Sequence, residues 1–156
     1  MHVTLEDRFW GLRGESGLRL AIVAAEAVVG AHRYQYSRLL TDDEALIDKC
    51  VQLARDISDG ARDEQTLMTM TSVATQCRNL SKKRNRGCEQ TRRRLRAWLA
   101  VEAARDLGFA ASRMGDDKAI MAPAVIRIHH YLVVAKASTQ PVMEELERIE
   151  TDLSAN

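Results

Sequence analysis

The residues of this sequence with the clearest chemical potential form one cationic stretch, residues 78–96. The stretch carries nine cations and a single acid, Glu89, so its net charge is +8. Because the whole chain is only +1, the other residues together sum to −7. Arginine and lysine at this density can pair with carboxylates or neutralise phosphates. The charge asymmetry therefore indicates a contact surface for an acidic macromolecule.

The cationic stretch is predicted to be a helical hairpin. A basic turn of roughly residues 82–87 joins two expected helices, 62–82 and 88–107, and so short a connection makes the helices antiparallel. Successive helix residues point about 100° apart, so neighbouring arginines cannot all contact one partner. The residues that we expect to contact the partner are Lys82, Lys83, Arg84, Arg86, Arg93 and Arg96.

Three interpretations of the hairpin remain open at this stage. We favour an acidic protein partner, contacted by a small non-enzymatic adaptor, inhibitor or regulator. Sequence-independent nucleic-acid binding is the first alternative, although only Trp98 is near enough to stack on bases. The third interpretation is that the cations are simply solvated, or that they pair with the acidic C-terminal segment 144–152, which holds five acids and one arginine.

Catalytic and metal-binding motifs are missing from the sequence. It contains neither the Glu-x-x-His pairs of a di-iron bundle nor His-Glu-x-x-His. His129 and His130 are adjacent on an expected helix and cannot easily share one ion. We therefore predict no metal, no cofactor and no enzymatic activity. The rival hypothesis is a small helical enzyme with a dispersed site, which a deep closed pocket lined by His32, Tyr36 and His130 would support.

The three cysteines do not form a recognisable framework. An odd number without a Cys-x-x-Cys pair argues against disulfides and against a zinc site. Cys50 and Cys77 lie on apolar helical faces and are expected to be buried thiols. Cys88 lies among cations, which favour its thiolate.

Composition predicts an all-α protein with a single compact helical-bundle domain spanning residues 1–156. Apolar residues make up 46% of the chain, and it has only two prolines and eight glycines. No run approaches the roughly 18 apolar residues of a membrane span. Acids in the first ten residues do not fit a signal peptide. We therefore expect a cytoplasmic protein with no membrane partner.

Apolar periodicity predicts about five main helices plus a short N-terminal one. The expected segments are 4–13, 16–40, 42–58, 62–82, 88–107 and 117–137, with a last acidic helix opening near Pro141. The glycine-rich residues 11–17 match no phosphate-binding motif and are expected to be a plain loop. Gly108 is expected to end the fifth segment.

Further expectations concern individual helices. Thr4 with Asp7, and Thr41 with Glu44, have the spacing of N-terminal capping boxes. Pro123 should cause a kink or a fresh helix start within 117–137. That segment is apolar on nearly every face and is expected to be central and buried. Helix 16–40 adds Ala21 and Val28 to a long apolar stripe, and this surplus predicts a homodimer.

Overall fold

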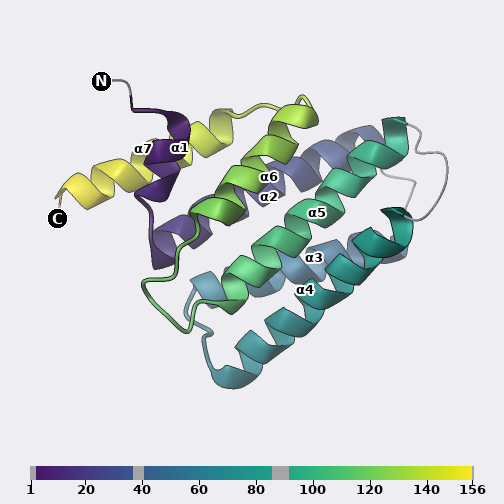
Figure 1. Ribbon diagram of the computed structural model, residues 1–156, viewed down its shortest axis with the longest axis horizontal. Helices are drawn as coiled ribbons and strands as arrows, with labels where there is room; N and C mark the ends of the chain where they lie inside the picture. The colour runs from purple at the N-terminus through teal and green to yellow at the C-terminus, as the bar shows by residue number, and fades with distance from the viewer. Residues whose placement is uncertain (1–2, 37–40, 86–91, 156) are drawn as a thin grey trace.

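The computed structural model describes residues 3–36, 41–85 and 92–155 of the chain (Figure 1). These residues form an all-α bundle, as composition predicted, and no strand occurs among them. The helices among these residues number seven, which is one for each expected segment and one more than the predicted total of about six: α1 (Leu5–Trp10), α2 (Gly14–Tyr36), α3 (Thr41–Ser58), α4 (Glu64–Asn85), α5 (Arg92–Ser112), α6 (Ala122–Val134) and α7 (Gln140–Ala155).

Helix α1 begins at the predicted capping box. The Thr4 hydroxyl accepts a hydrogen bond from the Asp7 amide at 3.1 Å, and the Asp7 carboxylate accepts one from the Thr4 amide at 3.0 Å. Together these bonds satisfy two of the amide groups that a helix start leaves unpaired. The equivalent box at Thr41 includes side chains outside the described part of the structure.

The glycine-rich segment is a site of close approach rather than a plain loop. Helix α2 begins at Gly14, earlier than expected, with a φ of +54°. A Cβ at Gly14 would lie 2.0 Å from the Asp117 carbonyl oxygen, and the Gly14 amide donates to the Ala119 carbonyl at 3.0 Å. Only glycine therefore allows the start of α2 to meet the connection that precedes α6.

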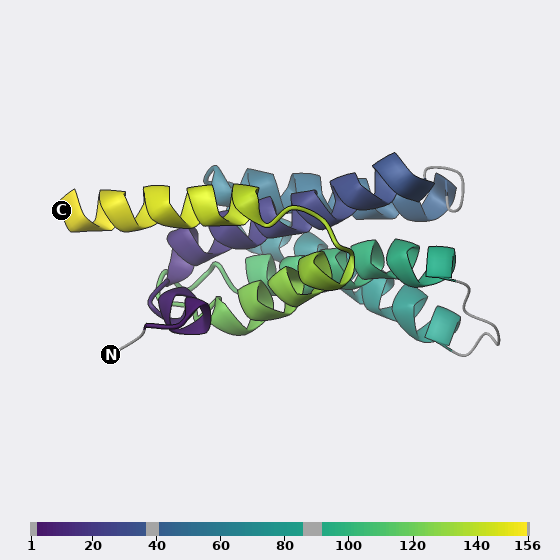
Figure 2. The same cartoon turned by 90° about the horizontal axis from the view of Figure 1, so that it is seen from above.

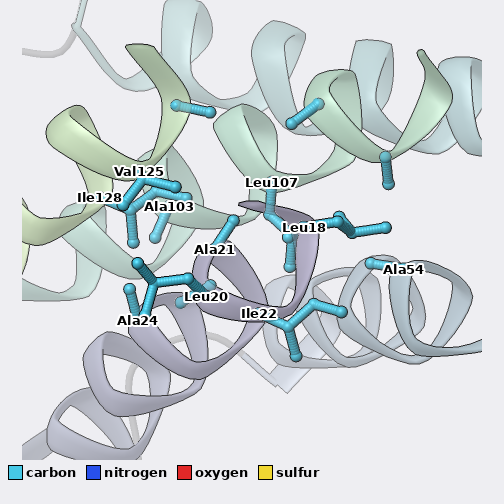
Figure 3. Packing of buried hydrophobic residues seen from close by; sticks show 14 of the residues in the cluster. Leu18, Leu20, Ala21, Ile22, Ala24, Ala54, Ala103, Leu107, Val125 and Ile128 are labelled. Atoms are coloured by element: carbon cyan, nitrogen blue, oxygen red, sulfur yellow. The ribbon is translucent and has the colours of Figure 1, made fainter. Parts of the chain in front are cut away.

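Helices α5 and α2 form the centre of the bundle. Helix α5 contacts α2, α3, α4 and α6, and the side chains between them are small or aliphatic (Figure 3). Leu18, Leu20, Ala103 and Leu107 are all completely buried. Both Ala21 and Val28 of α2 are buried inside the same chain, so these two residues do not supply the surplus apolar face from which a homodimer was predicted.

Helix α6 corrects two expectations. It starts at Ala122, with Pro123 in its first turn, so the proline marks a fresh start and the segment 117–121 is not helical. One face of the helix is buried, but Val133 and Val134, which lie elsewhere on it, are about half exposed, at 51% and 49%. The helix therefore lies at the side of the bundle, with one face uncovered.

Helix α5 also runs further than the sequence indicated. It passes through Gly108 to Ser112, because this glycine serves packing instead of termination. A Cβ there would lie 2.8 Å from the Ala74 Cβ and 2.9 Å from the Cys50 Sγ. Met68 of α4 is 59% exposed.

The acidic C-terminal helix α7 packs against α2 and runs past the other helices at its C-terminal end (Figure 2). Val142, Leu146 and Ile149 are buried, whereas Leu153 is 54% exposed. No helix in the described part of the structure is long and apolar enough to cross a membrane.

Candidate binding surface at the α4–α5 end

The cationic hairpin has the expected antiparallel geometry. Ser81 of α4 hydrogen-bonds to Glu102 of α5, while Ala74, further back in α4, lies against Gly108, further along α5. The last turn of α4 and the first turn of α5 therefore lie side by side at one end of the bundle (Figures 1 and 2). We call the last turn of α4, residues 86–91 and the first turns of α5 the α4–α5 end.

The structure describes the side chains of only some of the predicted contact residues. Lys82 lies in the last turns of α4 with an exposed side chain. Lys83 and Arg84 belong to the same turns, and Arg93 and Arg96 belong to the first turns of α5, but their side chains lie outside the described part of the structure. Arg86 lies wholly outside it. The fold thus brings the two flanks of the stretch together, while the side-chain contacts of these residues stay predictions.

Arg78 is separated from this group. Its guanidinium carbon lies 5.4 Å from the centre of the Phe109 ring, near the far end of α5. An arginine over an aromatic face is held by electrostatic attraction to the ring. Phe109 lies near the end of α5 that is farther from the hairpin. The Arg78 side chain therefore points away from the α4–α5 end, and Arg78 is not part of the candidate surface.

The acids of α7 have other partners in the same chain. Glu150 pairs with Arg8 of α1 through two hydrogen bonds of 3.0 and 2.5 Å. Glu145, which is 6% exposed, pairs with Arg19 of α2 at 3.2 Å and also with Arg148. The C-terminal end of α7 also lies at the opposite end of the bundle from the hairpin (Figure 2). These contacts do not favour the interpretation in which α7 neutralises the hairpin.

A partly buried polar network lies next to the α4–α5 end. The Glu102 carboxylate accepts hydrogen bonds from Ser81 and from the Trp98 indole, the latter at 3.1 Å, and it pairs with Arg105. Arg105 in turn lies 3.3 Å from a carboxylate oxygen of Asp106. Polar groups satisfied in this way fix the helices to one another. The network therefore holds the two arms of the hairpin in place.

Tyr131 connects the network to α6. Its hydroxyl donates to Asp106 at 2.8 Å and accepts from Arg105 at 3.3 Å, and Arg127 approaches Asp106 at 3.5 Å. Burial, followed by the charge of Asp106, raises the pKa of the Tyr131 phenol. This network was not predicted from the sequence, although Glu102, Arg105 and Asp106 interrupt the otherwise apolar run 97–111 and could have indicated it.

The cysteines, histidines and other potential catalytic residues do not form a recognisable catalytic centre in the described region. Cys50 and Cys77 are buried, and the Cys50 thiol donates to the Ala104 carbonyl at 3.0 Å. No group of three potential metal ligands occurs among the described residues. His130 lines a groove that is open to solvent, while the side chains of His32 and Tyr36 lie outside the described part.

Comparison with protein families, with curated proteins and with solved structures finds no match for this chain. The case for a function therefore rests on geometry and charge.

Proposed function

We propose that the α4–α5 end binds an acidic surface of a protein partner, and that the protein works through this binding as a small adaptor, inhibitor or regulator. The observation that carries the proposal is the placement of both flanks of the +8 stretch at one end of the bundle. Binding there would direct most of the cations of the chain's most basic segment toward one partner. Clustered charge of one sign accelerates encounter with a partner of opposite charge.

Local acids do not reverse this charge. Asp42, Asp43 and Glu44 begin α3, which starts at the same end of the bundle (Figure 1). Without Arg78 the stretch still carries eight cations and one acid, Glu89, so these three further acids leave the sign of the local charge positive. The polar network around Glu102 then supplies a rigid base for this surface, which lowers the free-energy cost of ordering the surface on binding.

The surroundings of the hairpin favour protein over nucleic acid. Trp98 is only 8% exposed, and its indole nitrogen is engaged by Glu102, so its ring is not presented for base stacking. Helix α5 contacts four other helices along its 21 residues and cannot lie in a major groove as a recognition helix. Sequence-independent contact with phosphates remains the alternative outcome.

The proposal can be tested with two variants of matched charge. The first replaces Lys83, Arg84 and Arg86 with alanine, removing three cations from the α4–α5 end. The control replaces Lys49, Lys118 and Lys136, which are exposed elsewhere. Both variants and the native chain are immobilised, and proteins captured from native lysate are compared with and without nuclease treatment.

We expect the native chain and the control to retain a specific protein that the hairpin variant loses, and nuclease should not change the result. Capture that nuclease abolishes would replace the protein partner with nucleic acid. If the hairpin variant and the control retained every captured molecule equally, the cations would be a solvated face and the proposal would be wrong. Helical content of each variant, measured by circular dichroism, confirms that binding is compared between folded chains.

A further inference from the structure

Two buried thiols lie where α3, α4 and α5 meet, and the proposed function uses neither of them. Cys50 of α3 and Cys77 of α4 are both completely buried, and the three helices pack directly against one another. A single buried cysteine behaves as a small apolar side chain. Two thiols at one place can also be oxidised to a disulfide, so their relative position decides their chemistry.

The Cys50 sulfur is positioned by two neighbouring turns of α5. Its thiol donates a hydrogen bond to the Ala104 carbonyl at 3.0 Å, and a Cβ on Gly108, one turn further along, would lie 2.9 Å from the same sulfur. That Cβ would also lie 2.8 Å from the Ala74 Cβ of α4. The Cys50 sulfur therefore lies between Ala104 and Gly108, on the side of α5 that meets α4.

Cys77 lies at the same level of the bundle. It follows Ala74 by three residues, so both side chains are on one face of α4. Because α4 and α5 are antiparallel, one turn beyond Ala74 in α4 corresponds to one turn before Gly108 in α5, which is the turn of Ala104. The Cys50 and Cys77 thiols are accordingly hydrogen-bonded to each other, from two different helices.

The surroundings distinguish the two thiols. Their mutual hydrogen bond lowers the pKa of Cys77, burial opposes this effect, and the charge of Arg105 adds to it. The same hydrogen bond, followed by burial, raises the pKa of Cys50. Because the side chain of Arg105 is 23% exposed, the cation that favours the Cys77 thiolate also reaches solvent. Cys77 is therefore the nucleophile of the pair, and Cys50 is the thiol beside it.

We propose that Cys50 and Cys77 form a redox site, which hydrogen peroxide converts into a disulfide between α3 and α4. Peroxide is little larger than water and reaches the pair through local opening of the helices. The Cys77 thiolate attacks one peroxide oxygen, the O–O bond breaks, and the departing hydroxide takes up the proton that Cys77 had released. Cys77 is then a sulfenic acid.

The Cys50 sulfur next attacks the Cys77 sulfur. The S–S bond forms, the S–O bond breaks, and the hydroxyl group leaves as water with the Cys50 proton. The two thiols have together lost two electrons to one peroxide molecule. This site is independent of the proposed binding at the α4–α5 end.

Cys88 provides an internal comparison for this geometry. It is only 11 residues from Cys77 in sequence, whereas Cys50 is 27 residues away. In an unfolded chain the shorter loop closes more readily, by about fourfold from loop length alone. Oxidation without the fold therefore favours a link between Cys77 and Cys88, whereas the folded arrangement favours one between Cys50 and Cys77.

Peptide mapping of the full chain tests the proposal. The chain is treated with hydrogen peroxide under native conditions and, separately, in concentrated urea, and is then alkylated and digested with trypsin without reduction. The tryptic peptides that carry Cys50, Cys77 and Cys88 are 50–55, 63–78 and 87–92, respectively. We expect 63–78 to be joined mainly to 50–55 in the native sample, and mainly to 87–92, by about fourfold, in the urea sample.

Variants then isolate the pair and assign its roles. In folded Cys88→Ser, peroxide should remove both thiols from alkylation and dithiothreitol should restore them, with helical content by circular dichroism unchanged. With Cys50→Ala added, the remaining Cys77 should stop at a sulfenic acid that dimedone labels. The matched control adds Cys77→Ala instead, and its remaining Cys50 should stay unlabelled.

Three outcomes would overturn the proposal. In the first, the native sample joins 63–78 mainly to 87–92, as the unfolded chain does. In the second, the thiols of folded Cys88→Ser stay free under peroxide, or are lost in a form that dithiothreitol does not restore. In the third, dimedone labels Cys50 but not Cys77, which would contradict the assigned nucleophile.

Discussion

Gly108 shows how a single missing methyl group sets the spacing of three helices. A Cβ there would press on Ala74 of α4 and on the Cys50 thiol of α3, both buried. Alanine is the better helix former by about 1 kcal/mol, but overpacking a rigid core costs about 1–3 kcal/mol. We therefore expect Gly108→Ala to lower the free energy of unfolding by up to about 2 kcal/mol, measured by urea denaturation.

Gly30 of α2 provides the matched control, because a Cβ there would meet nothing within 4 Å. Gly30→Ala should raise the free energy of unfolding by roughly 0.5–1 kcal/mol, through the lower chain entropy of the unfolded state. Stabilisation by both substitutions would show that α5 can shift away from Ala74 and Cys50, and that Gly108 is not required for packing.

His129 makes the α1–α6 contact sensitive to acid. Its Nε2 is buried without a hydrogen-bond partner among the described residues, and burial, followed by the charge of His130, lowers its pKa. The unfolded chain therefore binds more protons than the folded chain below the ordinary histidine pKa of about 6.5, and stability falls as pH drops through that value.

The urea midpoint of the native chain should accordingly decrease between about pH 7 and pH 5, and His129→Gln should flatten this decrease. The control His130→Gln changes an exposed side chain and removes only the smaller cause of the lowered His129 pKa, so it should keep most of the decrease. The carboxylates of Asp7, Asp63 and Glu150 have lowered pKa values, so the stability they contribute is lost only at more acidic pH. A midpoint that is flat down to pH 5 in the native chain would contradict this role of His129.

At the scale of the helices, the sequence predicted those helix starts that depend on periodicity and on the chemistry of neighbouring residues. The capping box at Thr4 and the fresh start at Pro123 are determined by neighbouring residues, and both were confirmed. Predictions that depend on tertiary packing failed. Gly108 resembles a helix terminus until Ala74 and Cys50 are known to lie against it, and periodicity alone could not show that α6 leaves Val133 uncovered.

The candidate surface was predictable to the same degree. Counting charges located the cationic stretch, and the short connection predicted that its helices would be antiparallel. The network that supports it was not predictable, because Ser81, Glu102 and Tyr131 come from three helices whose relative rotation is set by the core. The side-chain contacts of Lys83, Arg84, Arg86, Arg93 and Arg96 stay predictions.

Tyr131 is the element-scale test of that network, because it couples α6 to α5. Tyr131→Phe removes the 2.8 Å donor to Asp106 while leaving Arg105 and Arg127 beside the carboxylate. We expect a loss of about 1–2 kcal/mol in the free energy of unfolding. In a double-mutant cycle with Asp106→Asn the two losses should be less than additive, whereas strict additivity would mean that the hydroxyl and the carboxylate act independently.

At the scale of the whole molecule, charge and apolar surface are divided between opposite regions. The α4–α5 end gathers cations, whereas the tail of α7, with its acids and uncovered Leu153, lies at the other end (Figure 2).

Salt dependence reports which class of partner the α4–α5 end contacts. On a duplex nucleic acid each neutralised phosphate adds about 0.9 to the slope of log K against log salt, so alanine at Lys83, Arg84 and Arg86 should lower the slope by roughly 2–3 units. Condensed counterions are not released from an acidic protein surface in this way, so there the same variant should mainly slow association, with a weaker salt dependence. Titrations with a duplex and with the captured protein, at several salt concentrations, measure both quantities. Because the control variant at Lys49, Lys118 and Lys136 removes the same charge from the chain, an equal change in both variants would mean that net charge, and not the placement of the hairpin, governs binding.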